Sequence, residues 1–128
     1  MESVIIAAPF PYDAELRIRL ERVGPVTMGA AGALVVDDGS SRVYVIRNDA
    51  VYDDLEPERL RLFTTAISNP IFYSIEFSDI AMCRKVLEVI ADDPKLLVDN
   101  DHGVLLPGPE FVRVLRSQRD WDWRVRAP

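Results

Sequence analysis

The only histidine of the chain, His102, stands among carboxylates, an arrangement that suits general base chemistry. Asp99 and Asp101 lie within three residues of it. A histidine base needs a partner that orients the imidazole and adjusts its pKa, and a neighbouring carboxylate can do both. The same residue types are typical of a polar hairpin tip, where Asn and Asp side chains bond to nearby backbone. We favour the hairpin tip and predict no catalytic residue here.

The segment 99–103 (DNDHG) also has the opening residues of a calcium-binding loop. An EF-hand loop needs glycine at its sixth position and a bidentate glutamate at its twelfth. Counting from Asp99, the sixth position is Val104 and the glycine comes one place early, although Glu110 stands twelfth. Residues 96–98 predict a strand where an EF-hand has a helix. We therefore predict no metal site, with weak adventitious cation binding as the alternative.

Nucleophiles and cofactor motifs are scarce. Cys83, the only cysteine, falls on the apolar stripe of a predicted helix, so we predict a packed thiol and no disulfide. The sequence holds no Gly-x-Ser-x-Gly, Gly-x-Gly-x-x-Gly or Walker A string, and no Cys/His set suited to zinc. We accordingly predict no catalytic residue, no metal and no cofactor.

Three pairs of adjacent acids could supply two carboxylates for acid–base chemistry. They are Asp37-Asp38, Asp53-Asp54 and Asp92-Asp93. Such chemistry needs a sheltered cleft in which one carboxyl has a raised pKa. All three pairs fall in predicted turns or helix ends, so we predict that water surrounds them and keeps them ionised.

Hydrophobic periodicity predicts the elements that carry these residues. Asp13 is the predicted N-cap of a first helix, Gly24-Pro25 stops it, and Asp38-Gly39 supplies a hairpin turn. Pro57 suits the first turn of a later helix. The elements predicted for the first half are a strand over 4–10, a helix over 14–23, a strand over 26–28, hairpin strands over 33–36 and 42–46, and a helix over 57–67.

The second half repeats this order. The strand over 71–77 alternates, with Ser74 and Glu76 on one face, and Ser78 is the predicted cap of the following helix. The predicted elements are a strand over 71–77, a helix over 79–91, hairpin strands over 96–98 and 104–106, and a helix over 110–118.

The pattern predicts one α+β domain over residues 1–128, a mostly antiparallel sheet with three to four helices packed on it. Two pseudo-repeated βαββα halves, 1–68 and 69–118, are one interpretation of the shared order, and a coincidence of pattern is the other. A tail, 119–128, carries Trp121 and Trp123. These indoles either fold back onto the body or anchor a partner, and we favour folding back.

The net negative charge of the chain argues against nucleic acid as a partner. The 128 residues carry a formal net charge of −6, and the five arginines after residue 110 leave the preceding body more acidic still. An acidic body repels nucleic-acid phosphates, so we predict no nucleic-acid binding. No apolar run approaches the length of a membrane span, and the first residues lack the basic region of a signal peptide. We expect a cytoplasmic protein with no membrane partner.

The segment 97–111 (LVDNDHGVLLPGPEF) resembles a motif of small, mostly uncharacterised bacterial proteins. In that group, strand–VDND-x-G–strand–LPG-x-EF–helix closes a chain of about this length, and the strand and helix over 71–91 look similar as well. Such small acidic proteins are often similar to immunity proteins, which bind and neutralise an interbacterial toxin. His102 falls at the open x position, so the resemblance implies no catalytic histidine.

We therefore expect a non-enzymatic protein-binding module, specifically an immunity-type inhibitor that binds a basic toxin domain through an acidic surface. The acid-rich segment 49–58 is the first candidate surface and the turn at 37–38 the second. The alternatives are a self-associating or regulatory interaction domain, hence a homo-oligomer, and a small enzyme or ligand-binding domain. The residues predicted to contact the partner are Tyr52, Asp53, Asp54, Glu56, Glu58, Asp37 and Asp38.

Overall fold

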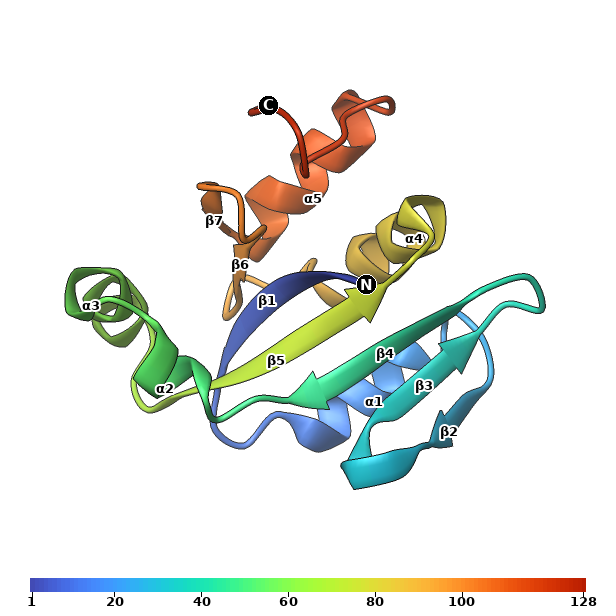
Figure 1. Cartoon of the computed structure of the whole chain (residues 1–128), viewed down its shortest axis with the longest axis horizontal. Helices are drawn as coiled ribbons and strands as arrows, with labels where there is room; N and C mark the ends of the chain where they lie inside the picture. Colours follow the sequence, from blue (N-terminus) through green and yellow to red (C-terminus); the bar gives the residue numbers. More distant parts are fainter.

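Seven strands form a single sheet in the computed structural model, which describes residues 1–128 (Figure 1). The strand order is β2-β3-β4-β5-β1-β6-β7, and every neighbouring pair is antiparallel. The predicted antiparallel sheet is confirmed. The strands are β1 (Glu2–Pro9), β2 (Val26–Met28), β3 (Leu34–Asp37), β4 (Arg42–Arg47), β5 (Pro70–Phe77), β6 (Leu97–Asp99) and β7 (Leu105–Pro107).

Five α-helices accompany the sheet, so the α+β class is confirmed with one helix more than the three to four predicted. The additional helix, α2, is a single turn inside the acid-rich segment, where no apolar periodicity marks it. The helices are α1 (Asp13–Leu20), α2 (Val51–Asp54), α3 (Pro57–Ala66), α4 (Ile80–Ile90) and α5 (Gly108–Ser117), with a 3-10 turn at Ala30–Gly32. None reaches the length and apolarity that crossing a membrane requires.

Both predicted N-caps are wrong by one position. The N-cap of α1 is Tyr12, because Asp13 is already helical and its carboxylate accepts a hydrogen bond from the Tyr73 hydroxyl. The N-cap of α4 is Asp79, one place after Ser78, and its carboxylate accepts the backbone N–H groups of Ala81 and Met82 at 2.9 and 3.4 Å. A side-chain oxygen therefore caps the free N–H groups of α4, whereas no side chain caps those of α1.

The first strand lies in the middle of the sheet. β1 pairs with β5 along its whole length, from Glu2 opposite Phe77 to Pro9 opposite Pro70, and with β6 on its other side. Segments from both notional halves therefore alternate in one sheet. In Figure 1 the N-terminus begins β1 within this central pair, and the C-terminus lies beside α5.

The pseudo-repeat is not confirmed. The hairpin β3–β4 joins β5 through its second strand, β4, whereas the hairpin β6–β7 joins β1 through its first strand, β6. The closing helices also differ, because α3 and α5 contribute to separate hydrophobic clusters on opposite faces of the sheet. The halves 1–68 and 69–118 share an order of elements and differ in their arrangement.

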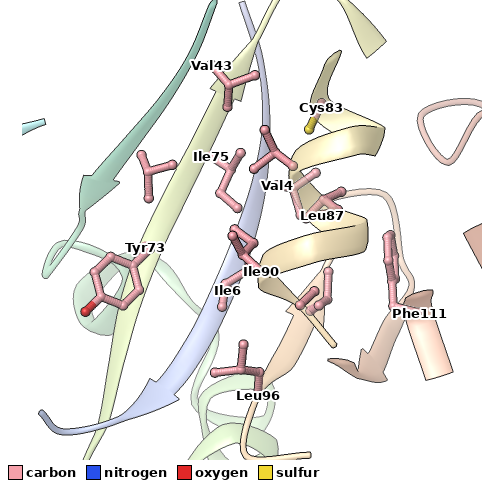
Figure 2. Packing of buried hydrophobic residues seen from close by; sticks show 14 of the residues in the cluster. Val4, Ile6, Val43, Tyr73, Ile75, Cys83, Leu87, Ile90, Leu96 and Phe111 are labelled. Atoms are coloured by element: carbon pink, nitrogen blue, oxygen red, sulfur yellow. The ribbon is translucent and has the colours of Figure 1, made fainter. Parts of the chain in front are cut away.

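The main core fills the face that α1, α4 and α5 cover. Strand alternation places Val4 and Ile6 of β1 on this face, where they meet Leu87 of α4 and Phe111 of α5 (Figure 2). Cys83 lies in the same cluster with no exposed surface, so the predicted packed thiol is confirmed.

The C-terminal segment completes this core. Trp121 and Trp123 have no exposed surface, so the indoles fold back onto the body. Their rings pack against each other at 6.2 Å between centroids and against Phe111 at 5.3 and 6.1 Å. Arg84 of α4 fixes this segment, since its guanidinium donates to the carbonyl oxygens of Leu115, at 3.1 Å, and Trp121, and lies over the Trp123 ring.

Candidate functional site

The opposite face of the sheet is covered only in part, by α2 and α3, and a cleft of about 300 Å³ opens beside them. Phe63 of α3 and Val51 of α2 pack on Ala7 and Phe72 of the sheet, which fixes the covered end. We call the neighbouring opening the acidic cleft. Its lining consists of Ser3, Ile5, Asn48, Val51, Asp54, Leu55, Phe63, Ser74, Glu76, Asp99 and Asp101.

Strand alternation makes the floor of the acidic cleft polar. In β5, Ile75 and Phe77 face the main core, so Ser74 and Glu76 face the cleft, as their alternation in the sequence predicts. The register places Ser3 of β1 opposite Glu76. Asn48 joins them, because its side-chain N–H donates to the Ser74 hydroxyl at 2.8 Å. The floor therefore offers carboxylate, hydroxyl and amide oxygens to a ligand.

Two segments that are distant in the sequence bring carboxylates to the walls of the acidic cleft. Asp54 comes from α2, and Asp99 and Asp101 come from the end of β6. Asp99 is only 6% exposed and pairs with Arg59 of α3 at 3.1 Å. This part-buried ion pair connects α3 to β6 and so helps to fix the wall that β6 contributes.

Nine of the 21 acidic side chains have no arginine, lysine or histidine nitrogen within 4.0 Å. Three of these nine line the acidic cleft, and three more lie within four residues of Asp54 in the sequence. We call these six residues the acidic patch. The acidic patch consists of Asp53, Asp54, Glu56, Glu58, Glu76 and Asp101. Most other carboxylates of the molecule are neutralised by an internal arginine, lysine or histidine. The acidic patch is the main concentration of negative charge without an internal partner.

The predicted surface over 49–58 therefore forms one rim of the acidic cleft. Asp53, Asp54, Glu56 and Glu58 are all exposed. Tyr52 has a structural role as well, because its hydroxyl donates to the Pro70 carbonyl and its ring packs edge-on against Phe72, with 5.1 Å between centroids. Tyr52 thus anchors α2 to β5 and holds the neighbouring carboxylates in place.

The second predicted surface, Asp37 and Asp38, is not part of the acidic patch. It lies at the β3–β4 turn, at the opposite end of β4 from α2. Asp37 pairs with Arg42 at 2.9 Å and Asp38 with Lys85 at 3.5 Å. The backbone N–H groups of Ser40 and Ser41 hold the pKa of Asp38 well below its usual value. These carboxylates stabilise the turn, and their charge is already compensated.

His102 has neither predicted carboxylate as its partner. Its Nε2 lies 3.8 Å from Glu2, whereas Asp99 faces Arg59 and Asp101 faces the cleft. The imidazole is exposed at a hairpin tip, with no arrangement around it that would orient a base. No group of three or more His, Cys, Asp or Glu side chains is placed to hold a metal ion.

Two further polar residues are buried, and one of them, Asp93, contradicts the prediction that water surrounds the three acid pairs. Asp93 is 3% exposed, accepts from the Tyr12 hydroxyl at 2.9 Å and faces Arg19 at 3.4 Å. Burial acts to raise its pKa, but hydrogen bonds from the Lys95 backbone and Tyr12 outweigh it, so the pKa is lowered. Asn100 has no exposed surface at all. The sequence indicates a turn at both positions and does not reveal the distant partners, which are Tyr12 and Arg19 for Asp93 and Trp123 for Asn100.

Comparison with protein-family models, with curated proteins and with solved structures finds no match to this chain. The resemblance of residues 97–111 to a bacterial motif therefore stays a prediction.

Proposed function

We propose that this protein is a non-enzymatic binding module that captures a basic surface of another protein at the acidic cleft, and that it acts as an immunity-type inhibitor of a bacterial toxin. The observation that carries this proposal is the acidic patch, in which three carboxylates without an internal cation line one concave opening and three more are exposed on the adjoining segment 53–58. Like charges held together repel one another, and a guanidinium or ammonium group from a partner removes that cost.

The lining of the acidic cleft suits a long basic side chain. Leu55 and Ile5, which are both partly exposed, provide an apolar wall against which the methylene stem of an arginine or lysine packs. Glu76, Asp54 and Asp101 surround the position of the charged head, and carboxylate pairs are the acceptors that a guanidinium fork prefers. The cleft volume of about 300 Å³ is large enough for one such side chain.

A second copy of this chain is a poor occupant of the acidic cleft. Its net charge is −6, and it would bring like charge to the acidic patch. A basic toxin domain has the opposite sign, so long-range attraction speeds the encounter before any contact forms. The resemblance of residues 97–111 points to the same class of partner.

Capture with a matched pair of baits tests the proposal. The wild-type chain is immobilised beside D53N/D54N/E56Q/E58Q, and lysate of the source organism is passed over both. We expect a basic protein that binds the wild type and not the neutralised variant. Expressed alone, that protein should be toxic, and co-expression of the wild-type chain should restore growth.

A control bait with the same charge change is E21Q/D92N/E110Q/D120N, whose four positions are exposed and lie outside the acidic patch. It should retain the partner. Equal loss from both baits would show that net charge alone governs capture and would refute the site. A captured protein that is acidic, or harmless when expressed alone, would refute the immunity function.

A further inference from the structure

A groove of about 640 Å³ lies on the uncovered part of the sheet, on the same face as the acidic cleft. The helices of this face, α2 and α3, pack on β1, β5, β6 and β7. In Figure 1 no helix crosses in front of β2, β3 or β4. We call this hollow the open-face groove. The residues that contribute side chains to it are Pro25, Thr27, Val35, Asp37, Arg42 and Tyr44.

The floor of the open-face groove is accessible and largely apolar. Strand alternation turns Val35 and Tyr44 away from the main core, because their neighbours Val36 and Val43 are buried in it. Val35 and Tyr44 are partly exposed, and Thr27 beside them is exposed, so all three have surface available to a ligand. The register places Thr27 opposite Val35 and Val35 opposite Tyr44, which makes one row across three strands.

The open-face groove carries no net charge of its own, but it adjoins a free carboxylate. Arg42 and Asp37 form an ion pair at 2.9 Å and neutralise each other. The row of side chains continues from Tyr44 to Glu76, which lies directly opposite on β5 and lines the acidic cleft. Side chains directly opposite each other have Cβ atoms about 5 Å apart. A neutral apolar floor and a member of the acidic patch are therefore immediate neighbours.

We propose that the open-face groove and the acidic cleft form one docking surface, which takes a basic side chain of the partner in the cleft and an apolar or aromatic side chain of the same partner in the groove. This inference rests on the proposed function, because it uses the acidic cleft as the cation site. Neighbouring strands lie about 4.8 Å apart, so Glu76 and Val35, two strands apart, are separated by about 10 Å. The partner therefore presents its two side chains at about that spacing.

The chemistry of each part selects the occupant. Glu76 attracts a cation, whereas the neutral groove beside it favours an apolar side chain, for which the tyrosine ring is a typical interface contact. A second copy of this chain would bring its own acidic patch to the same face, so a basic partner has the favourable charge. Once one contact has formed, the other becomes intramolecular, and the two together bind more tightly than either alone.

Titration of the ¹⁵N-labelled full-length chain with three peptides tests the docking surface. Acetyl-Trp-Ala-Arg amide carries both groups, acetyl-Trp-Ala-Gln amide lacks the cation, and acetyl-Ala-Ala-Arg amide lacks the indole. We expect the first peptide to shift the backbone N–H signals of Tyr44 and Glu76 saturably and to bind at least fivefold more tightly than either of the others. Absence of saturable shifts up to 10 mM peptide, or equal affinity for the three peptides, would overturn the proposal.

Two variants with the same charge change show whether the groove is occupied. Thr27→Arg lays a cationic side chain in the groove from an exposed position. Met28→Arg is the control, because Met28 is also exposed but points to the other face of the sheet, outside the groove. We expect binding of the Trp-Ala-Arg peptide to weaken at least fivefold in the first variant and much less in the second, with the ¹⁵N spectrum reporting that each is folded. Equal losses in the two variants would overturn the proposal.

Glu76→Gln separates this inference from the proposed function, because it removes the charge beside the groove and keeps the shape of the side chain. We expect at least fivefold weaker binding of the Trp-Ala-Arg peptide and no change for the Trp-Ala-Gln peptide. Loss in Glu76→Gln with none in Thr27→Arg would overturn the extension into the groove and leave the acidic cleft of the proposed function standing. Loss in Thr27→Arg with none in Glu76→Gln would show an apolar site that needs no cation, and would count against both.

Discussion

The side-chain N–H of Asn100 donates a hydrogen bond of 2.8 Å to the backbone carbonyl of Trp123. The Oδ1 atom of the same amide accepts the backbone N–H groups of His102 and Val104, each at 2.9 Å. One fully buried side chain therefore shapes the β6–β7 turn and fastens the C-terminal segment to it. The asparagine in the motif that the resemblance rests on thus has a structural explanation, independent of any partner.

Replacing Asn100 should destabilise the fold strongly. Asn100→Ala removes three hydrogen bonds and leaves buried backbone groups unpaired, so we expect the free energy of unfolding to fall by about 2–4 kcal/mol. Urea denaturation followed by tryptophan fluorescence measures it. His102→Ala, two positions away and exposed, should change stability by less than about 0.5 kcal/mol. Similar losses in the two variants would mean that the turn, and not the Asn100 amide, carries the effect.

Gly108 should tolerate no side chain. A Cβ at this position would stand 2.0 Å from the carbonyl oxygen of Ala91, and both groups are backbone, so neither can move aside. We expect Gly108→Ala to cost at least about 3 kcal/mol of unfolding free energy. Gly39→Ala is the comparison, because Gly39 has open space around it and a φ of +92°, which costs about 1–2 kcal/mol. A smaller loss at Gly108 than at Gly39 would contradict this account of the α4–α5 junction.

The pairing of Asp122 with Arg124 should make stability depend on pH. Side-chain hydrogen bonds from Arg124, at 2.9 and 2.7 Å, lower the pKa of Asp122 to about 2. The unfolded value is about 3.9, so the charged carboxylate stabilises the folded state above pH 4 and this contribution is lost as pH falls through 2. The stability difference between wild type and D122N should be constant from pH 7 to 4 and should shrink between pH 4 and 2.

Chemical denaturation at several pH values measures that difference. D120N serves as the control, because the Asp120 side chain is 90% exposed. A gap between wild type and D122N that stays constant down to pH 2 would show that the ion pair contributes nothing to the folded state.

Cys83 should report on global unfolding. Burial raises the pKa of its thiol, and the thiolate is the reactive form, so a thiol reagent cannot label it in the folded state. We expect 5,5′-dithiobis(2-nitrobenzoate) to react at the rate of unfolding, and at once in guanidinium chloride. In A81C, the added thiol is exposed and should react immediately, whereas Cys83 should still react only at the rate of unfolding. Rapid reaction of two thiols in folded A81C would show that α4 opens locally.

Charge reversal in the acidic patch should slow association with the captured partner. D53K/D54K/E56K/E58K inverts the long-range attraction, so we expect the association rate to fall at least tenfold at low salt, with little change in the free energy of unfolding. Stopped-flow fluorescence measures the rate. The difference between wild type and variant should shrink as ionic strength rises. Unchanged association at low salt would refute steering by this surface.

Local sequence signals were sufficient for most of the secondary structure. The Asp38-Gly39 turn between β-branched runs predicts the β3–β4 hairpin, and the alternation through Ser74 and Glu76 predicts which face of β5 is polar. These features depend on neighbouring residues, and neighbours are visible in a single sequence. The helix α2 was missed because one turn of four residues leaves no periodicity to detect.

The walls of the acidic cleft could not be predicted in the same way. Asp99 and Asp101 approach Asp54 only because β6 pairs with β1 and Arg59 reaches across from α3, and strand order is a tertiary property. The burial of Asp93 has the same origin, since its partners Tyr12 and Arg19 come from the other end of the chain. Composition marks such residues as turn formers and gives no sign of their distant partners.

The central place of β1 has a consequence for biosynthesis. The strand leaves the ribosome before both of its neighbours, β5 and β6, which lie more than 60 residues later in the sequence. Its apolar residues, Val4 to Ala8, therefore have no strand partner until β5 and β6 have been synthesised. Both edges of β1 are paired only after β6 has been synthesised, and a prematurely terminated product lacking β6 would present an unpaired, hydrophobic strand edge to chaperones and proteases.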